Sequence, residues 1–172
     1  MRTMHRRYVS CLAITVSLMA SMVLAQGAVP ATVEFAPDAA AALQKTYGSR
    51  EEGALRAAIL AALGKEQRHD ALPEGVSLKV TVRQVKPTHP TLQQQLDNPS
   101  LSAARTRYLG GADLVGEVRD ARQQVLATVD YRNFADVPAA GSPSLDPWAD
   151  ARQAIEGFAA KFASAWERLP KG

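Results

Sequence analysis

The chain has 172 residues, 47% of them hydrophobic and 22% charged, with a formal net charge of +3 at pH 7. Three arginines among the first 25 residues account for this excess, so the rest of the chain is formally neutral and lacks the clustered positive charge that nucleic acids or polybasic membrane attachment require. The single cysteine, Cys11, lies in the same N-terminal stretch, so residues 26–172 have no thiol for a disulfide, a nucleophile or a zinc site.

Residues 1–25 have the pattern of a secretory signal peptide. Arginines precede an uncharged run from Val9 to Ala25, which ends in small or apolar residues before Gln26. This pattern predicts cleavage between Ala25 and Gln26, with export of a single domain, 26–172, to the periplasm or the medium. A retained N-terminal anchor is the alternative, because the run is close to the shortest that spans a bilayer. No membrane span is expected once the signal is removed.

The first predicted elements of the domain are a short strand and a short helix. Thr32–Phe35 places Val33 and Phe35 on one face, as a half-buried strand does. Pro37 ends this strand, and the alanine-rich stretch Ala39–Lys45 predicts a short helical piece.

A longer helix is predicted from Ser49; Gly64 ends it, or it continues weakly to about His69. Ser49 and Glu52 have the spacing of a capping box, in which the serine oxygen accepts a backbone N–H and the glutamate reaches back. Apolar side chains then recur every four residues and predict one buried stripe. The stripe consists of Leu55, Ile59 and Leu63.

A strand and a long loop follow. Residues Val76–Arg83 alternate between apolar and polar side chains, which predicts a strand with one buried face and one wet face. The polar stretch from Pro87 to about Gly111 is long for a compact domain, and such loops are usually functional or disordered. A short helix is one interpretation of Ser100–Tyr108 within it.

A hairpin and a final helix complete the pattern. Ala112–Arg119 and Val125–Arg132 read as two strands joined by a short turn. Further on, Asp146 is the predicted cap of the last helix and Pro147 suits its first position. An apolar seam predicts that this helix packs on the sheet, and Trp166 beside it is predicted to be half exposed. The seam consists of Trp148, Ala151, Ile155, Phe158, Phe162, Ala165 and Leu169.

These elements predict an α+β fold. The order is β-α-β-β-β-α, and we expect a single domain with an antiparallel or mixed sheet of about four strands and two helices packed on one face.

The residues that could carry chemistry have simpler interpretations. His69 suits the end of a helix, and His89 reads as a solvated loop histidine. The acids of the hairpin, such as Asp113, read as surface ion pairs with Arg119 and Arg132. The sequence has no nucleophile elbow and no metal-ligand motif, so we predict no catalytic residue, no metal and no cofactor.

The long loop is the predicted binding site, because function concentrates in loops held by a rigid scaffold. Its candidate contact residues are His89, Arg105, Arg107 and Tyr108. The expected partner is an envelope protein or a small ligand.

Two stretches carry a resemblance to known proteins. LPEGVSLKVTVRQV is similar to a turn and strand of small secreted bacterial domains of unknown function, and ADLVGEVRDARQQVLATVDYR with WADARQAIEGFAAKF resembles the end of another such family. Many of those domains are lipoproteins, but this chain lacks a lipid-modified cysteine at the cleavage point. The resemblance implies a periplasmic compartment and an α+β fold, and no reaction.

The expected function is therefore that of an exported, non-catalytic binding or envelope-associated protein. Two alternatives remain open. One is a periplasmic hydrolase that uses His89 or His69 with a carboxylate. The other is an envelope subunit that self-associates through an exposed sheet edge.

Overall fold

The computed structural model describes residues 31–69, 72, 75–137 and 144–169. The predicted signal peptide and its cleavage site lie outside these residues. Within them, no helix combines the length and the apolar character needed to cross a membrane.

Four strands form one mixed sheet. They are β1 (Ala31–Phe35), β2 (Ser77–Lys86), β3 (Gly111–Arg119) and β4 (Val125–Phe134), and they lie side by side in that order. β1 runs parallel to β2, whereas β3 and β4 continue the sheet in antiparallel fashion. The predicted α+β fold with a mixed four-stranded sheet is confirmed.

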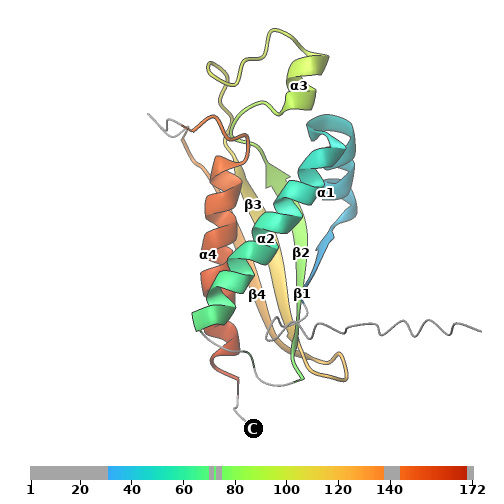
Figure 1. The fold of residues 1–172 in the computed structure, drawn as a ribbon, viewed down its shortest axis with the longest axis vertical. Helices are drawn as coiled ribbons and strands as arrows, with labels where there is room; N and C mark the ends of the chain where they lie inside the picture. Colours follow the sequence, from blue (N-terminus) through green and yellow to red (C-terminus); the bar gives the residue numbers. More distant parts are fainter. Residues whose placement is uncertain (1–30, 70–71, 73–74, 138–143, 170–172) are drawn as a thin grey trace, which may run out of the picture.

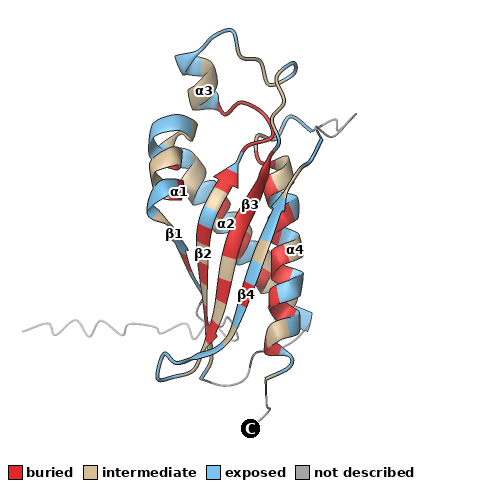
Figure 2. Ribbon diagram, turned by 180° about the vertical axis from the view of Figure 1, so that it is seen from behind, coloured by how far each residue is buried: buried red, intermediate tan, exposed pale blue. Residues whose placement is uncertain are grey.

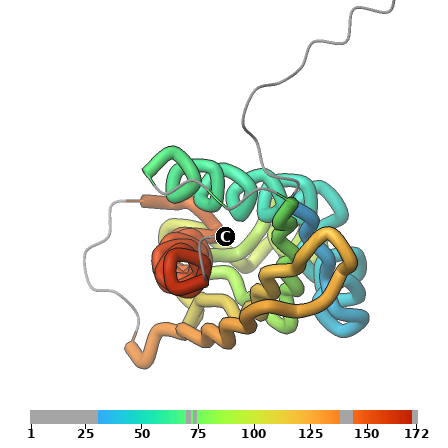
Figure 3. Tube along the Cα trace, turned by 90° about the horizontal axis from the view of Figure 1, so that it is seen from below, coloured from blue at the N-terminus to red at the C-terminus, as the bar shows by residue number. Residues whose placement is uncertain are grey.

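Helices cover one face of this sheet. The connection from β1 to β2 contains α1 (Pro37–Ala42), a π-helical turn (Leu43–Tyr47) and α2 (Ser49–His69). After the hairpin, α4 (Ala149–Trp166) packs against β3, β4 and α2. Figures 1 and 3 show α2 and α4 side by side on the same face. Figure 2 shows the sheet from behind, with β3 mostly buried and β4 mostly exposed.

The core lies between the sheet and these two helices. The predicted stripe of α2 is buried, and so is most of the α4 seam. Gly116 of β3 leaves room for Phe158 and Phe162 to approach the sheet, and these two rings lie 5.3 Å apart. Trp166 is only 2% exposed, so the prediction that it is half exposed is wrong. It continues the aromatic row, with its ring 5.5 Å from that of Phe162.

The two long helices begin differently from their predicted caps. Ser49 is already the first residue of α2, and the Glu52 carboxylate pairs with Arg56 at 2.9 Å. The start of α4 is two residues later than predicted, at Ala149. Asp146 nevertheless acts there, because its Oδ1 accepts the N–H of Trp148 at 2.9 Å.

The turn between β3 and β4 has a glutamine, Gln123, at the left-handed position where a glycine is more usual. Asp120 accepts the backbone N–H groups of Arg122 and Gln124, each at 2.8 Å. Gln123 adopts the left-handed conformation, with φ of 64°. The aspartate thus holds the tight turn that the sequence predicted without its usual signal.

Candidate functional site

The connection from β2 to β3, residues 87–110, extends beyond the end of the sheet. We call it the β2–β3 loop. It contains a helix that the sequence did not predict, α3 (Leu92–Asp97), which lies near the far end of the molecule (Figure 1). The helix considered over Ser100–Tyr108 is wrong, because that stretch forms turns.

The base of the β2–β3 loop is polar and buried. Thr88 donates its N–H to the Pro147 carbonyl at 2.6 Å and accepts the Tyr108 N–H on its own carbonyl at 2.8 Å. Its Oγ1 accepts the N–H of Asp150, in the first turn of α4, at 3.0 Å. Gly110 fits beside this contact, because a Cβ there would lie 2.6 Å from that same oxygen. One threonine therefore joins both ends of the loop to α4.

His89 is part of this buried base. It is 1% exposed, so its interpretation as a solvated loop histidine is wrong. Its Nδ1 lies 3.1 Å from the Thr106 carbonyl, which places the ring proton on that nitrogen. The imidazole therefore braces the two arms of the loop against each other and does not face solvent.

Helix α3 has its own start signal. Thr91 and Gln94 form a capping box, in which each side chain bonds the other residue's backbone N–H, at 3.3 and 3.1 Å. This is the signal that could have revealed α3 in the sequence. The helix then exposes Leu92 and Leu96, at 60% and 67%. Leu109, near the end of the loop, is 45% exposed.

The four predicted contact residues do not form one cluster on the surface. Arg105 is exposed in a turn where its N–H and that of Thr106 bond the Ser102 carbonyl, whereas Arg107 and Tyr108 are half-buried. His89 lies inside. Their role as contacts stays a prediction for Arg105, Arg107 and Tyr108, whereas the exposed leucines of α3 were missed.

An aromatic junction lies next to the loop, where α2 and α4 begin. The rings of Tyr47 and Trp148 meet edge to face, 5.5 Å apart, and Trp148 donates its indole N–H to Glu51 at 2.6 Å. Burial raises the pKa of the Tyr47 phenol, and the nearby Tyr108 raises this pKa further. Tyr108 therefore lies where the loop meets this junction.

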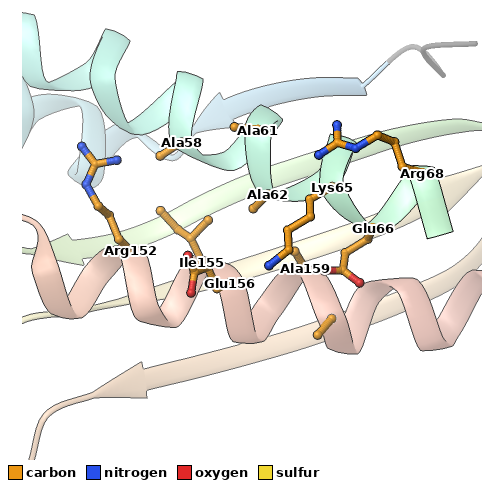
Figure 4. Close-up of a pocket in the computed structure, with 11 residues that line it drawn as sticks. Ala58, Ala61, Ala62, Lys65, Glu66, Arg68, Arg152, Ile155, Glu156 and Ala159 are labelled. Carbon is orange, nitrogen blue, oxygen red and sulfur yellow. The ribbon is translucent and has the colours of Figure 1, made fainter. Parts of the chain in front are cut away.

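Among the described residues, hollows open to solvent include three between neighbouring elements. One of about 500 Å³ lies between α3 and the start of α2, lined by Leu92, Leu96 and Tyr47 among others. A second, of about 460 Å³, runs between α2 and α4 over a floor of alanines and Ile155 (Figure 4). The third, of about 330 Å³, lies between α1 and β2. Of these three, the first adjoins the β2–β3 loop.

The acids of the hairpin form ion pairs, but Asp113 is buried, so its interpretation as a surface residue is wrong, and its shorter bond goes to a residue of β2 that the sequence did not indicate. Asp113 bonds Arg83 at 2.7 Å and lies 3.5 Å from Arg132. Arg83 also bonds Asp130, and its hydrogen bond with Asp113 raises the pKa of this guanidinium. Across the described ranges, no group of three or more His, Cys, Asp or Glu side chains is placed to hold a metal ion.

The two histidines among the described residues lie in different surroundings. His89 is buried at the base of the loop, and His69 is exposed at the last position of α2. What the fold and the site define is an α+β domain with a projecting, internally braced loop. Comparisons with protein-family models, with curated proteins and with solved structures gave no match.

Proposed function

We propose that this chain is an exported, non-catalytic binding protein that contacts a partner protein through the β2–β3 loop. Export rests on the signal-peptide pattern of residues 1–25. Binding rests on one observation, which is that a loop with a buried, hydrogen-bonded base presents leucines to solvent at its far end.

The leucines matter because of where they lie. Apolar side chains exposed on a mobile loop do not by themselves indicate a binding site. Here, however, α3 is capped, and the loop base beneath it contains Thr88, Thr91 and His89, which are all buried. Leu92 and Leu96 are four residues apart, so they share one face of α3. Exposed apolar groups on a rigid support are typical of protein contact sites, because little conformational freedom is lost on binding.

The pairing of charge and apolar surface favours a protein as the partner. Arg105 is exposed on the same loop, and arginine is enriched in protein interfaces. The hollow between α3 and α2 gives such a partner a place for one side chain next to Leu92 and Leu96.

The test is photo-crosslinking in the cells that produce the protein. A photoreactive amino acid at Leu96 should give a discrete crosslinked product, because this side chain faces the partner. The same amino acid at Ser164, exposed near the end of α4 that is far from the loop, is the matched control and should give none. The product should weaken when Leu92→Ser is added.

Two outcomes would count against the proposal. Crosslinking at Leu96 that is absent, or no stronger than at Ser164, would remove the loop as the contact site. Mass spectrometry of the isolated protein tests export separately: a mature chain that begins at Gln26 supports it, and a retained Met1 in a cytoplasmic fraction contradicts it.

A further inference from the structure

The free edge of β4 is an unused pairing surface. β4 is the last strand of the sheet and runs for ten residues, Val125–Phe134, with much of its length exposed. No described strand pairs with its outer edge. A long open edge of this kind offers N–H and C=O groups to any strand that approaches, and proteins usually cover such edges.

One lysine covers this edge. Lys161 of α4 donates its Nζ hydrogen to the Asp130 carbonyl at 3.0 Å, and its ammonium lies 5.9 Å from the centroid of the Tyr131 ring. The Asp130 carbonyl therefore points away from β3. Backbone groups alternate along an antiparallel strand, so the N–H and C=O groups of Thr128, Asp130 and Arg132 face the free edge.

The other edge of the sheet, at β1, is covered in the same way by a cationic side chain from a helix. Arg56 of α2 bonds the Val33 carbonyl of β1, with its guanidinium 5.3 Å from the centroid of the Phe35 ring. The Ala36 N–H bonds Val82 of β2, so alternation directs the Val33 carbonyl outward. At both edges, a cationic side chain from a helix lies over an aromatic ring of the edge strand and bonds an outward-facing backbone carbonyl of that strand. The recurrence points to edge protection as the role of both cations.

The side chains of β4 are self-complementary. Asp130 and Arg132 lie two residues apart and so on one face of the sheet. If a second copy of β4 were to pair antiparallel about Tyr131, Asp130 of each copy would lie opposite Arg132 of the other. Opposite charges at facing positions stabilise a strand pair. Both side chains are accessible for this, at 65% and 67% exposed, although they bond Arg83 and Asp113 within the chain.

We propose that Lys161 holds the β4 edge closed, and that the strand which fits this edge when Lys161 is absent is β4 of a second copy. The two sheets would then join into one continuous sheet across a two-fold axis at Tyr131. This proposal is independent of the β2–β3 loop, which lies at one end of the molecule.

The test is sedimentation equilibrium of the purified protein over a wide range of concentrations. Wild type should remain a monomer, whereas Lys161→Ala should dimerise at least about tenfold more tightly. Lys161→Arg keeps a cationic donor and should remain a monomer. Lys65→Ala removes a lysine from an exposed position of α2, so it controls for the change in net charge and should also remain a monomer.

Two second-site variants place the contact on β4. Thr128→Pro removes an N–H that faces the free edge, and Arg132→Glu puts like charges opposite each other; either one should restore the monomer to Lys161→Ala. Circular dichroism checks that each variant is folded. The proposal is overturned if Lys161→Ala stays monomeric, if wild type dimerises equally well, or if the dimer survives both second-site changes.

Discussion

Single residues decide how closely α4 lies against the sheet. At Gly116, a Cβ would lie 2.8 Å from Phe158 and 2.9 Å from Phe162, and both phenylalanines are fully buried. On α4, Gly157 lies against the Tyr131 ring. Small residues on either side of the interface therefore make room for aromatic side chains, and an added methyl group must displace a packed ring.

Gly116→Ala should destabilise the protein by about 1–3 kcal/mol, because the new methyl group overpacks the core. Gly53 is the matched control, since a Cβ there meets nothing within 4 Å and the residue lies within α2. Gly53→Ala should leave stability unchanged or raise it by up to about 1 kcal/mol through helix propensity. Urea unfolding of the three proteins measures both effects. Equal effects at the two glycines would refute this account of the core.

Tyr47 makes stability depend on alkaline pH. Its phenol normally titrates with a pKa of 10.0, and burial followed by the influence of Tyr108 raises that pKa in the folded protein. The folded state then holds the proton more tightly than the unfolded chain. The resulting stability is complete below pH 10 and is lost as the pH rises through the folded pKa.

Tyr47→Phe should remove this contribution. The difference in unfolding free energy between wild type and Tyr47→Phe should be constant up to about pH 9. Above about pH 10, wild type should lose stability relative to Tyr47→Phe. Urea titrations at a series of pH values measure it. Parallel curves for the two proteins across this range would contradict the assigned cause.

At the scale of elements, the β2–β3 loop depends on its attachment to α4. Thr88 bonds Pro147, Tyr108 and Asp150, so it connects three separate segments. A buried N–H left without its acceptor costs about 1–3 kcal/mol. The attachment should therefore fail locally when the threonine hydroxyl is removed, while the sheet remains folded.

Thr88→Val keeps the shape of the side chain but leaves the Asp150 N–H without its partner. Limited proteolysis should cut this variant within residues 92–109 faster than wild type, and the unfolding free energy should fall by about 1–3 kcal/mol. Thr88→Ser retains the hydroxyl and should resemble wild type in the site of cutting. A valine variant that resists proteolysis as wild type does would show that this bond does not hold the loop.

The sequence was sufficient for elements whose pattern is repeated many times. Alternation over Val76–Arg83 and the seam of the last helix each predicted a buried face, and both faces pack in the core. The β2–β3 loop was harder, because its structure rests on contacts distant in sequence. Thr88 meets Asp150 across 62 positions, and such a pairing has no local signature. His89 was misread for the same reason.

At the scale of the whole molecule, stability is expected to be uneven. β2 and β3 are central strands, each paired on both sides, and they carry much of the buried core. An aromatic row then ties β4 to α4, with Tyr131 6.3 Å from Phe158. In contrast, α3 has no buried residue, and besides its base it contacts the π-helical turn Leu43–Tyr47. Opening of the loop need not disturb the sheet.

Native-state hydrogen exchange should separate these two levels. Amides of Val80 and Leu114, in the buried centre of the sheet, should exchange only through global unfolding, with a free energy equal to that from urea titration. The amide of Asn98, which caps the end of α3 by bonding the Gln94 carbonyl at 3.0 Å, should exchange through a smaller opening that is insensitive to low urea. Thr88→Val should lower the free energy of this local opening by a larger fraction than it lowers the free energy of global unfolding. If α3 and the central strands exchanged with one common free energy in both proteins, the loop would be part of the cooperative core, and its projecting leucines would owe their placement to the whole fold.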